Sequence, residues 1–169
     1  MRPASPSTVI RGLPALAGGG RPAGHPVSAR DGFLRASNYY RSAEFFLHGH
    51  PCDPRHEHAY ERSVQCFRSA AALFSPRIEP VQIPYEGTTL PGYLYRADTS
   101  GEPRPTVVMH NGFDGTAEEM HFFGAMAGVE RGYTVLAFDG PVSRDRCTAR
   151  AWSSAPAGRT WWVRCWTSP

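Results

Sequence analysis

The sequence predicts an α/β protein in which a helical hairpin precedes the first strands of a sheet. Two observations support this prediction. Apolar residues recur at helical spacing across residues 28–75, whereas short apolar runs separated by turns occupy residues 78–141. Within the second region, a strand, a helix and another strand follow one another over residues 106–138, the order of a crossover between parallel strands.

Composition excludes several functions. The chain has 169 residues, 18 Arg, 15 acidic residues and no Lys, so it has neither a Walker A lysine nor a Schiff-base lysine. Residues 31–141 carry nine Arg against fourteen acids, a balance of −5, while residues 1–30 and 142–169 are each +4. The basic character of the chain therefore belongs to its two ends, and nucleic-acid binding by the middle is not expected.

The changes in charge and composition along the chain suggest four segments. Residues 1–24 are rich in Pro, Gly and Ala and are expected to be a disordered leader, because their apolar run is too short for a secretion signal or a membrane span. A helical cap-like region follows over 25–77 and a partial sheet over 78–141. Residues 142–169 contain all four Trp but no Leu or Ile, and we expect a disordered tail. The cysteines form no C-x-x-C pair, so free thiols and a cytoplasmic location are expected for Cys52, Cys66, Cys147 and Cys165.

Two helices are predicted in the first region. A capping-box-like start at Ser28 to Asp31 opens a helix to about Leu47. Asp53 then precedes Pro54, the pattern of an N-cap and first turn, and the second helix reaches about Phe74. Both helices have apolar stripes, formed by Phe33, Leu34, Tyr40, Ala43 and Leu47 in the first and by Ala59, Ser63, Cys66, Phe67, Ala70, Leu73 and Phe74 in the second.

Four strands are predicted in the second region. Residues 81–85 alternate as an edge strand does, with Pro84 suited to an edge, and a turn over 86–89 leads to a strand over 90–96. Residues 106–110 form a short apolar strand of the buried type, and 133–138 form the fourth strand. Between these two, a capping box over 116–119 opens a helix to about Glu130, with Gly132 as its C-cap.

Three stretches resemble the α/β-hydrolase fold family. They are PTVVMHNGFDGT at 105–116, GYTVLAFDGP at 132–141 and RASNYYRSAEFFL at 35–47. These stretches resemble most closely bacterial hydrolases related to pseudooxynicotine hydrolase and to the fermentation/respiration-switch esterase-like proteins. The resemblance extends over about residues 25–141. The resemblance implies hydrolysis of an ester, an amide or an activated C–C bond in a small molecule, without a cofactor or a metal.

The same resemblance assigns a role to the loop after residues 106–110. In this fold that loop donates a backbone N–H to the oxyanion hole. Gly112 allows a sharp turn at the end of the strand, and the N–H of Phe113 is the candidate donor, so both are oxyanion-hole candidates. Asn111, Asp114 and Gly115 are expected to support the loop.

The catalytic triad of the family has no counterpart in the sequence. No G-x-S-x-G nucleophile elbow occurs, Ser143 lies on the wrong turn, and His110 and His121 come too early in the chain order. We therefore expect the front part of a hydrolase, joined to an unrelated tail and without turnover of its own. A change of reading frame is our hypothesis for the tail, and the other frames of the encoding DNA would test it. Without the next strand, residues 106–110 are expected to be an exposed edge that promotes self-association.

Alternatives of other classes remain. A cluster of residues that could bind zinc lies at 48–58: His48, His50, Cys52, Asp53, His56, Glu57 and His58. Their spacing does not match known zinc motifs, so no metal is expected there. Gly112 and Gly115 do not have dinucleotide-binding spacing. The Arg and Trp residues of the tail could hold single-stranded nucleic acid. A non-catalytic interaction module built on the helical hairpin and the partial sheet is the main rival.

Overall fold

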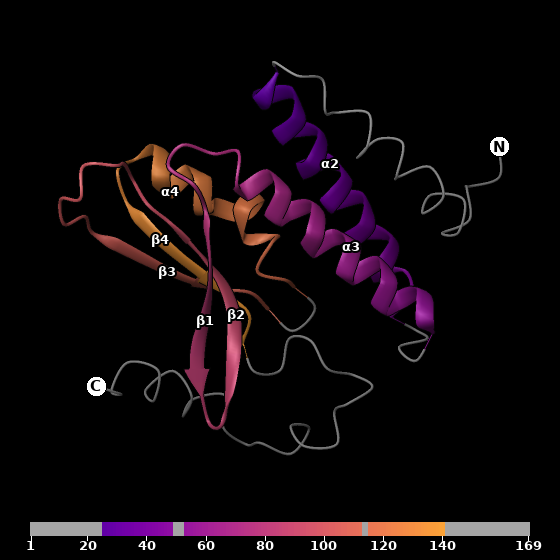
Figure 1. Cartoon of the computed structure of the whole chain (residues 1–169). Coiled ribbons are helices and arrows are strands. Elements are labelled where there is room, and N and C mark those ends of the chain that lie inside the picture. Colours follow the sequence, from indigo (N-terminus) through magenta and orange to yellow (C-terminus); the bar gives the residue numbers. More distant parts are fainter. Residues whose placement is uncertain (1–24, 49–52, 113–114, 141–169) are drawn as a thin grey trace.

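Two helices lie side by side next to a four-stranded sheet (Figure 1). The computed structural model describes residues 25–48, 53–112 and 115–140, so the predicted leader and tail, together with Cys52, Cys147 and Cys165, lie outside the described residues. The elements are α2 (Pro26–Phe45), α3 (Pro54–Ala71), β1 (Glu79–Tyr85), β2 (Thr88–Tyr95), β3 (Thr106–His110), a π-helical turn η1 (His121–Ala125), α4 (Met126–Glu130) and β4 (Thr134–Phe138).

The first helix starts differently from the prediction. Helix α2 begins at Pro26, two residues before the predicted start at Ser28, and no side chain caps it. Proline suits this position because its ring fixes the helical φ angle and it lacks an N–H that would be left unpaired there. Asp31 lies inside the helix and pairs with Arg30 at 2.9 Å, so the predicted capping box is wrong.

The second helix starts as predicted. The carboxylate of Asp53 accepts a hydrogen bond of 2.9 Å from the Arg55 N–H, and Pro54 follows it in the first turn. Helix α3 ends at Ala71 instead of Phe74, and a turn completes the segment. Its buried stripe is confirmed from Ala59 to Ala70, whereas Leu73 is exposed.

Small side chains let α2 and α3 approach each other closely. The hydroxyl of Ser37 donates to the backbone carbonyl of Ser63, and the Ser63 hydroxyl donates to that of Ser37, both at 2.9 Å. Beside this pair, Ala36, Tyr40 and Cys66 form a small buried cluster. The predicted helical hairpin is therefore a packed unit with reciprocal polar contacts.

The strand order is β1-β2-β4-β3. Strands β1 and β2 form an antiparallel hairpin, whose turn places Glu86 and Gly87 at φ of 40° and 80°. Strand β4 is antiparallel to β2 and parallel to β3, which confirms the parallel pairing of the third and fourth strands. Strands β1 and β3 lie at the two edges of the described sheet. The central residues of β3 are only half-buried, which fits its expected place at an edge of the sheet and not a strand covered on both sides.

The segment between β3 and β4 departs from the predicted continuous helix over 116–130. It consists of a turn, the π-helical turn η1 and the short helix α4, and Gly124 interrupts them with φ of 165° and ψ of −12°. A Cβ on Gly124 would lie 3.2 Å from Cε of Met109, so the segment packs closely on β3 at this point. Helix α4 ends at Glu130 as predicted, but its C-cap is Arg131, and Gly132, the predicted C-cap, follows with φ of 82°.

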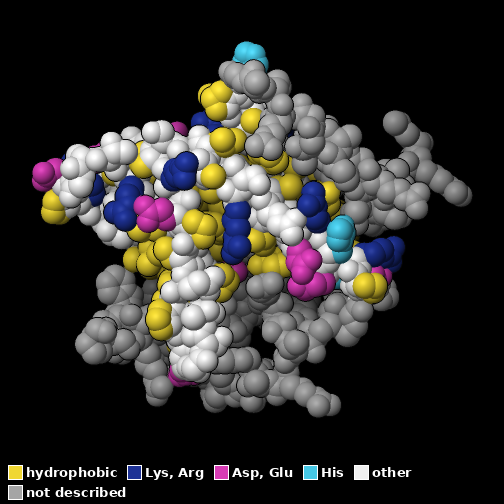
Figure 2. All heavy atoms as spheres, in the orientation of Figure 1, with side chains coloured by type: hydrophobic (Ala, Val, Ile, Leu, Met, Phe, Trp, Pro, Cys, Tyr) yellow, Lys and Arg dark blue, Asp and Glu magenta, His cyan; other side chains and the backbone are white. Residues whose placement is uncertain are grey.

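One face of the sheet carries the main core. Phe67 of α3 packs edge-on against Tyr93 of β2, and Ala125 and Val135 complete the fully buried part. The opposite face has a smaller cluster around Leu90 and Phe138. On the face drawn in Figure 2, hydrophobic side chains occupy the middle of the surface, with Arg and acidic side chains between them. No helix of the described chain has the length and apolar character needed to span a membrane.

Candidate functional site

The carboxyl ends of β3 and β4 meet at one edge of the sheet, where ligand sites of open α/β sheets form. Asn111 directly follows β3 and Asp139 directly follows β4, and both are buried. The side-chain amide of Asn111 donates to the Asp139 carboxylate, while its oxygen accepts a 3.3 Å hydrogen bond from the N–H of Gly140. These contacts fix the start of the loop relative to the neighbouring strand.

The two glycines on either side of residues 113–114 lie close together. The N–H of Gly115 donates to the carbonyl of Gly112 at 3.2 Å. A Cβ on Gly115 would lie 2.8 Å from Cβ of Asn111, so only glycine fits at this position. Gly112 is exposed and has no atom within 4 Å of the position of a Cβ. The other two predicted residues, Phe113 and Asp114, lie outside the described residues.

Helix α2 is connected to the far end of this loop through charged side chains. One carboxylate oxygen of Glu119, Oε2, accepts from the backbone N–H of Thr116 at 2.9 Å, which forms one half of the predicted capping box. The same oxygen accepts from Nε of Arg41 at 3.0 Å. Arg41 is buried and also pairs with Glu44 on its own helix. The loop is thus held from two sides, by β4 and by α2.

A pocket of about 530 Å³ lies between α2 and the loop. Gly112 and Gly115 form its loop wall, and Arg41 and Glu119 lie on its polar side. The apolar lining consists of Phe45, Phe46, Met120 and Phe123. Two of these residues are largely exposed to solvent, Phe46 at 76% and Phe123 at 74%. Two of the residues predicted at the oxyanion loop, Gly112 and Gly115, therefore border an apolar hollow, which we call the loop pocket.

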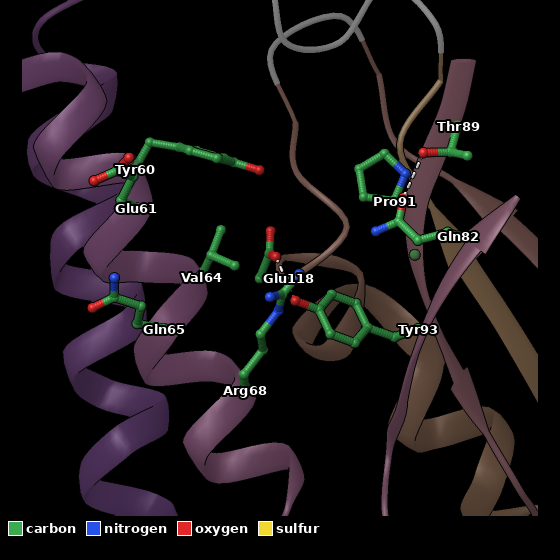
Figure 3. A pocket seen from close by; sticks show the side chains of 11 residues that line it. Tyr60, Glu61, Val64, Gln65, Arg68, Gln82, Thr89, Pro91, Tyr93 and Glu118 are labelled. Atoms are coloured by element: carbon green, nitrogen blue, oxygen red, sulfur yellow. Dashed lines mark hydrogen bonds between the residues drawn. The ribbon is translucent and has the colours of Figure 1, made fainter. Parts of the chain in front are cut away.

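A second hollow of about 440 Å³ separates α3 from the β1–β2 hairpin (Figure 3). Its lining is mainly polar and includes Gln65 and Arg68 of α3 and Gln82 of β1. At its inner end the hydroxyl of Tyr93 donates to Oε1 of Glu118 at 2.7 Å. The other oxygen, Oε2, is buried without a hydrogen-bond partner among the described residues.

Burial sets the protonation state of the groups near Glu118. Burial first, and then the negative charge of Glu118, raise the pKa of Tyr93 well above its ordinary value of 10.0. The same two causes raise the pKa of Tyr95. Both phenols therefore stay protonated near neutral pH, and Tyr93 acts there as a hydrogen-bond donor to the carboxylate.

Cys66 and four serines of α2 and α3 are not activated as nucleophiles. Burial raises the pKa of the Cys66 thiol, which keeps it in the unreactive protonated form, and Cys66 is a free cysteine as predicted. Hydroxyl groups of α2 and α3 donate to backbone carbonyls at Ser37, Ser42, Ser63 and Ser69. Among the described residues, these side chains provide no activated attacking group.

Sequence reasoning missed the charged residues that support the loop. Arg41 and Glu44 lie three residues apart on the buried side of α2, among Ser37 and Tyr40. A pair of opposite charges within an otherwise buried stripe was the available signal, since such charges are rarely buried unless they are paired. The role of Glu119 in linking two elements depends on the tertiary structure.

No protein-family model matches the chain. Among curated proteins it is 44% identical over 132 residues to hydrolase acrC of Aspergillus aculeatus, an alignment covering 70% of this chain and 31% of the relative. It is 37% identical over 132 residues to the alpha/beta hydrolase ucsC of an Acremonium species, covering 70% of this chain and 27% of that protein. Both organisms are fungi, which counts against the expected bacterial character.

A solved structure agrees with these relatives. The crystal structure of 2,6-dihydroxy-pseudo-oxynicotine hydrolase superposes with a TM-score of 0.70 and 26% sequence identity, covering 83% of this chain and 40% of that one. The chain spans about a third of the length of the two curated relatives, 31% and 27%. The helical pair and the mixed sheet therefore correspond to one part of such a hydrolase.

Proposed function

Because the chain belongs to the α/β-hydrolase family, we propose that the turn after β3 is the oxyanion loop of a hydrolase. The reaction is hydrolysis of an ester, an amide or an activated C–C bond in a small molecule. The observation that best supports this proposal is the position of Gly112 and Gly115 at the carboxyl end of β3. There they line an apolar pocket whose other side is formed by α2.

The support of the loop suits this role. An oxyanion-hole donor acts by being fixed in advance where negative charge develops, and one such donor contributes about 2.7–4 kcal/mol to transition-state stabilisation. The contacts of Asn111 with Asp139 and Gly140 hold the beginning of the loop, and Glu119 holds its end at Thr116. The candidate donor is the N–H of Phe113.

The loop pocket suggests the kind of substrate. Its phenylalanine and methionine side chains favour an apolar or aromatic group next to the reacting carbonyl. The charged residues of its lining, Arg41 and Glu119, have opposite signs and lie 3.0 Å apart, so the lining adds no strong net charge. A small, largely apolar carbonyl compound fits this arrangement better than a charged polymer does.

The chain alone is expected not to turn over substrate, because its sequence has no G-x-S-x-G nucleophile elbow. With p-nitrophenyl acetate we expect no burst of p-nitrophenolate and no effect of a serine-directed phosphonate. A phosphonate-sensitive burst would show that the chain contains a nucleophile that our reasoning overlooked.

A loop transplant tests the proposed role directly. Residues 110–116 would replace the loop after the third strand in 2,6-dihydroxy-pseudo-oxynicotine hydrolase, and turnover of the substrate in that enzyme's name would be measured. The transplant should remain active, and Phe113→Pro, which removes the backbone N–H, should lower kcat by about 100-fold to 1,000-fold with little change in KM.

Phe113→Ala is the matched control, because it removes the ring and keeps the N–H. Its kcat should stay within a few-fold of that of the unmodified transplant. Equal kcat values for the proline and alanine forms would refute the role of this N–H. A folded transplant that is inactive in every form would favour the rival function, a non-catalytic interaction module.

The proposal also includes a cytoplasmic location. Its support is the buried free thiol of Cys66, which is typical of a reducing compartment. Labelling of this cysteine by a thiol reagent only after unfolding, in protein taken directly from cells, is the expected result.

A further inference from the structure

Three side chains with metal-ligand atoms converge where α2 meets α3. Glu44 lies in the last turn of α2, His48 in the turn that follows it, and His56 in the first turns of α3. One ligand atom from each lies within 4.8 Å of the others. Sequence reasoning considered the histidines of this region and omitted Glu44, the residue on which the two imidazoles converge.

The distances centre on one oxygen. Oε1 of Glu44 lies 2.6 Å from Nε2 of His48 and 2.7 Å from Nε2 of His56. His48 forms a hydrogen bond at this distance. Nε2 of His56 is buried and, despite its proximity, has no properly oriented hydrogen-bond partner in the described part of the chain. Two ring nitrogens thus face a single carboxylate oxygen, and one of them is unsatisfied.

Neighbouring groups hold these ligand atoms in place. Arg41 binds the other carboxylate oxygen of Glu44, Oε2, and so turns Oε1 toward the histidines. The ring of Phe45 lies 5.0 Å from that of His48, and the two imidazole rings are 5.5 Å apart. Side-chain exposure is 6% for Glu44, 17% for His48 and 15% for His56, so the cluster is shielded and still reachable from solvent. Such supporting contacts are what orient the ligands of protein metal sites.

We propose that Glu44, His48 and His56 form a binding site for one divalent transition-metal ion, with Zn²⁺ as the test ion and water as the remaining ligand. Two imidazoles and one carboxylate are a common zinc ligand set, and imidazole disfavours Mg²⁺ and Ca²⁺. In tetrahedral zinc, ligand atoms lie about 3.3–3.5 Å apart, because each bond is about 2.0–2.2 Å. The two distances from Oε1 of Glu44 to the histidine nitrogens need to lengthen by less than about 1 Å to reach this geometry.

The metal would act as a clamp between the two helices. It would join the end of α2 to the start of α3, and Arg41 would connect it to Glu119 and hence to the loop. This site is separate from the loop pocket's proposed reaction, and it stands or fails independently of the proposed function. His58 is exposed on α3 and is not part of the cluster, although it is close in sequence.

The test is zinc titration of the full chain by isothermal calorimetry and by competition with a chromophoric chelator. We expect one ion per chain. Zinc at about 100 times its dissociation constant should raise the midpoint of thermal unfolding by about 5–10 °C. A well-folded chain that binds no stoichiometric zinc would overturn the proposal.

Variants locate the site. His48→Ala and His56→Ala should each weaken zinc binding by at least about 10-fold to 100-fold, whereas the matched control His58→Ala should bind as the parent chain does. Zinc binding that survives the double variant His48→Ala/His56→Ala would overturn the assignment. If a variant fails to fold, X-ray absorption at the zinc edge of the parent chain decides, because the proposal requires two imidazole nitrogens and a carboxylate oxygen and excludes sulfur.

Discussion

Acidification should destabilise this chain through His121, a buried histidine surrounded by aromatic rings. Its ring lies 5.6 Å from that of Phe67 and 5.4 Å from that of Phe74, and the residue is only 7% exposed. Nδ1 has no hydrogen-bond partner among the residues that the structure describes. Burial, followed by the positive charge of Arg30, lowers the pKa of His121 from 6.5 to about 4.

The sign and size of the effect follow from this depressed pKa. Between pH 6.5 and about 4, the unfolded chain takes up a proton at His121 while the folded chain does not. The contribution of His121 to stability is therefore fully present above pH 6.5 and is lost as the pH falls toward 4. Since one pKa unit corresponds to about 1.4 kcal/mol, the total loss is about 3 kcal/mol.

Urea unfolding at low protein concentration, repeated from pH 7.5 to pH 4, measures this loss as about 3 kcal/mol of unfolding free energy beyond the contributions of other groups. His121→Phe should remove it, because phenylalanine fits the aromatic surroundings and does not titrate. His58→Phe is the control: His58 is exposed in α3, and its replacement should leave the pH dependence unchanged.

A parallel pH dependence for the parent chain and His121→Phe would refute this reasoning. It would mean that His121 binds its proton equally well in the folded and unfolded chains. A changed pH dependence in His58→Phe would point instead to a general effect of replacing a histidine by phenylalanine.

Three further predictions concern the edge, a close contact and a buried charge. Val108→Lys on the edge strand β3 should reduce self-association, measured by sedimentation velocity, whereas the control Gln82→Lys on β1 should not. A parent chain that is monomeric at all concentrations would contradict the prediction of self-association through β3. Gly92→Ala should lower the free energy of unfolding by about 1–3 kcal/mol, because the new Cβ would lie 2.6 Å from the carbonyl oxygen of Ala137. The control Gly112→Ala should change the free energy of unfolding little, because a Cβ there has no neighbour within 4 Å. Arg41→Met should cost about 3–5 kcal/mol in urea unfolding, because it removes the arginine that pairs with Oε2 of the buried Glu44 and with Glu119. A cost as small as that of the exposed control Arg35→Met would contradict this.

Local signals predicted the elements that local chemistry determines. The N-cap of Asp53 and the end of α4 just before Gly132 depend on a few neighbouring residues, and both are confirmed. The bounds of β3, residues 106–110, agree with the prediction because the run is flanked by Pro105 and by the glycine-containing loop. The burial of β3 depends on its neighbours in the sheet, which no local pattern reveals.

The failures have a common cause in tertiary packing. The predicted helix over 116–130 has a suitable capping box and composition, yet the structure breaks it at Gly124, where the chain packs on Met109 of β3. The ligand cluster at the helix junction was judged from histidine spacing in the sequence. Its centre is Glu44, which lies on the other helix from His56 and becomes a neighbour only when the hairpin folds.

The charged contacts between α2 and the loop bear on the choice between a hydrolase and an interaction module. Oε2 of Glu119 accepts both from Arg41 of α2 and from the N–H of Thr116, so the helical pair and the end of the loop share one oxygen. Arg41 in this network is buried and Glu119 is partly buried, which makes the network costly to desolvate, and a module that only presents the outer surface of its helices has no need of it. A loop that must hold an N–H in place during a reaction does need a rigid second support. The position of Glu119 therefore favours the hydrolase interpretation, in which α2 is part of the site's scaffold.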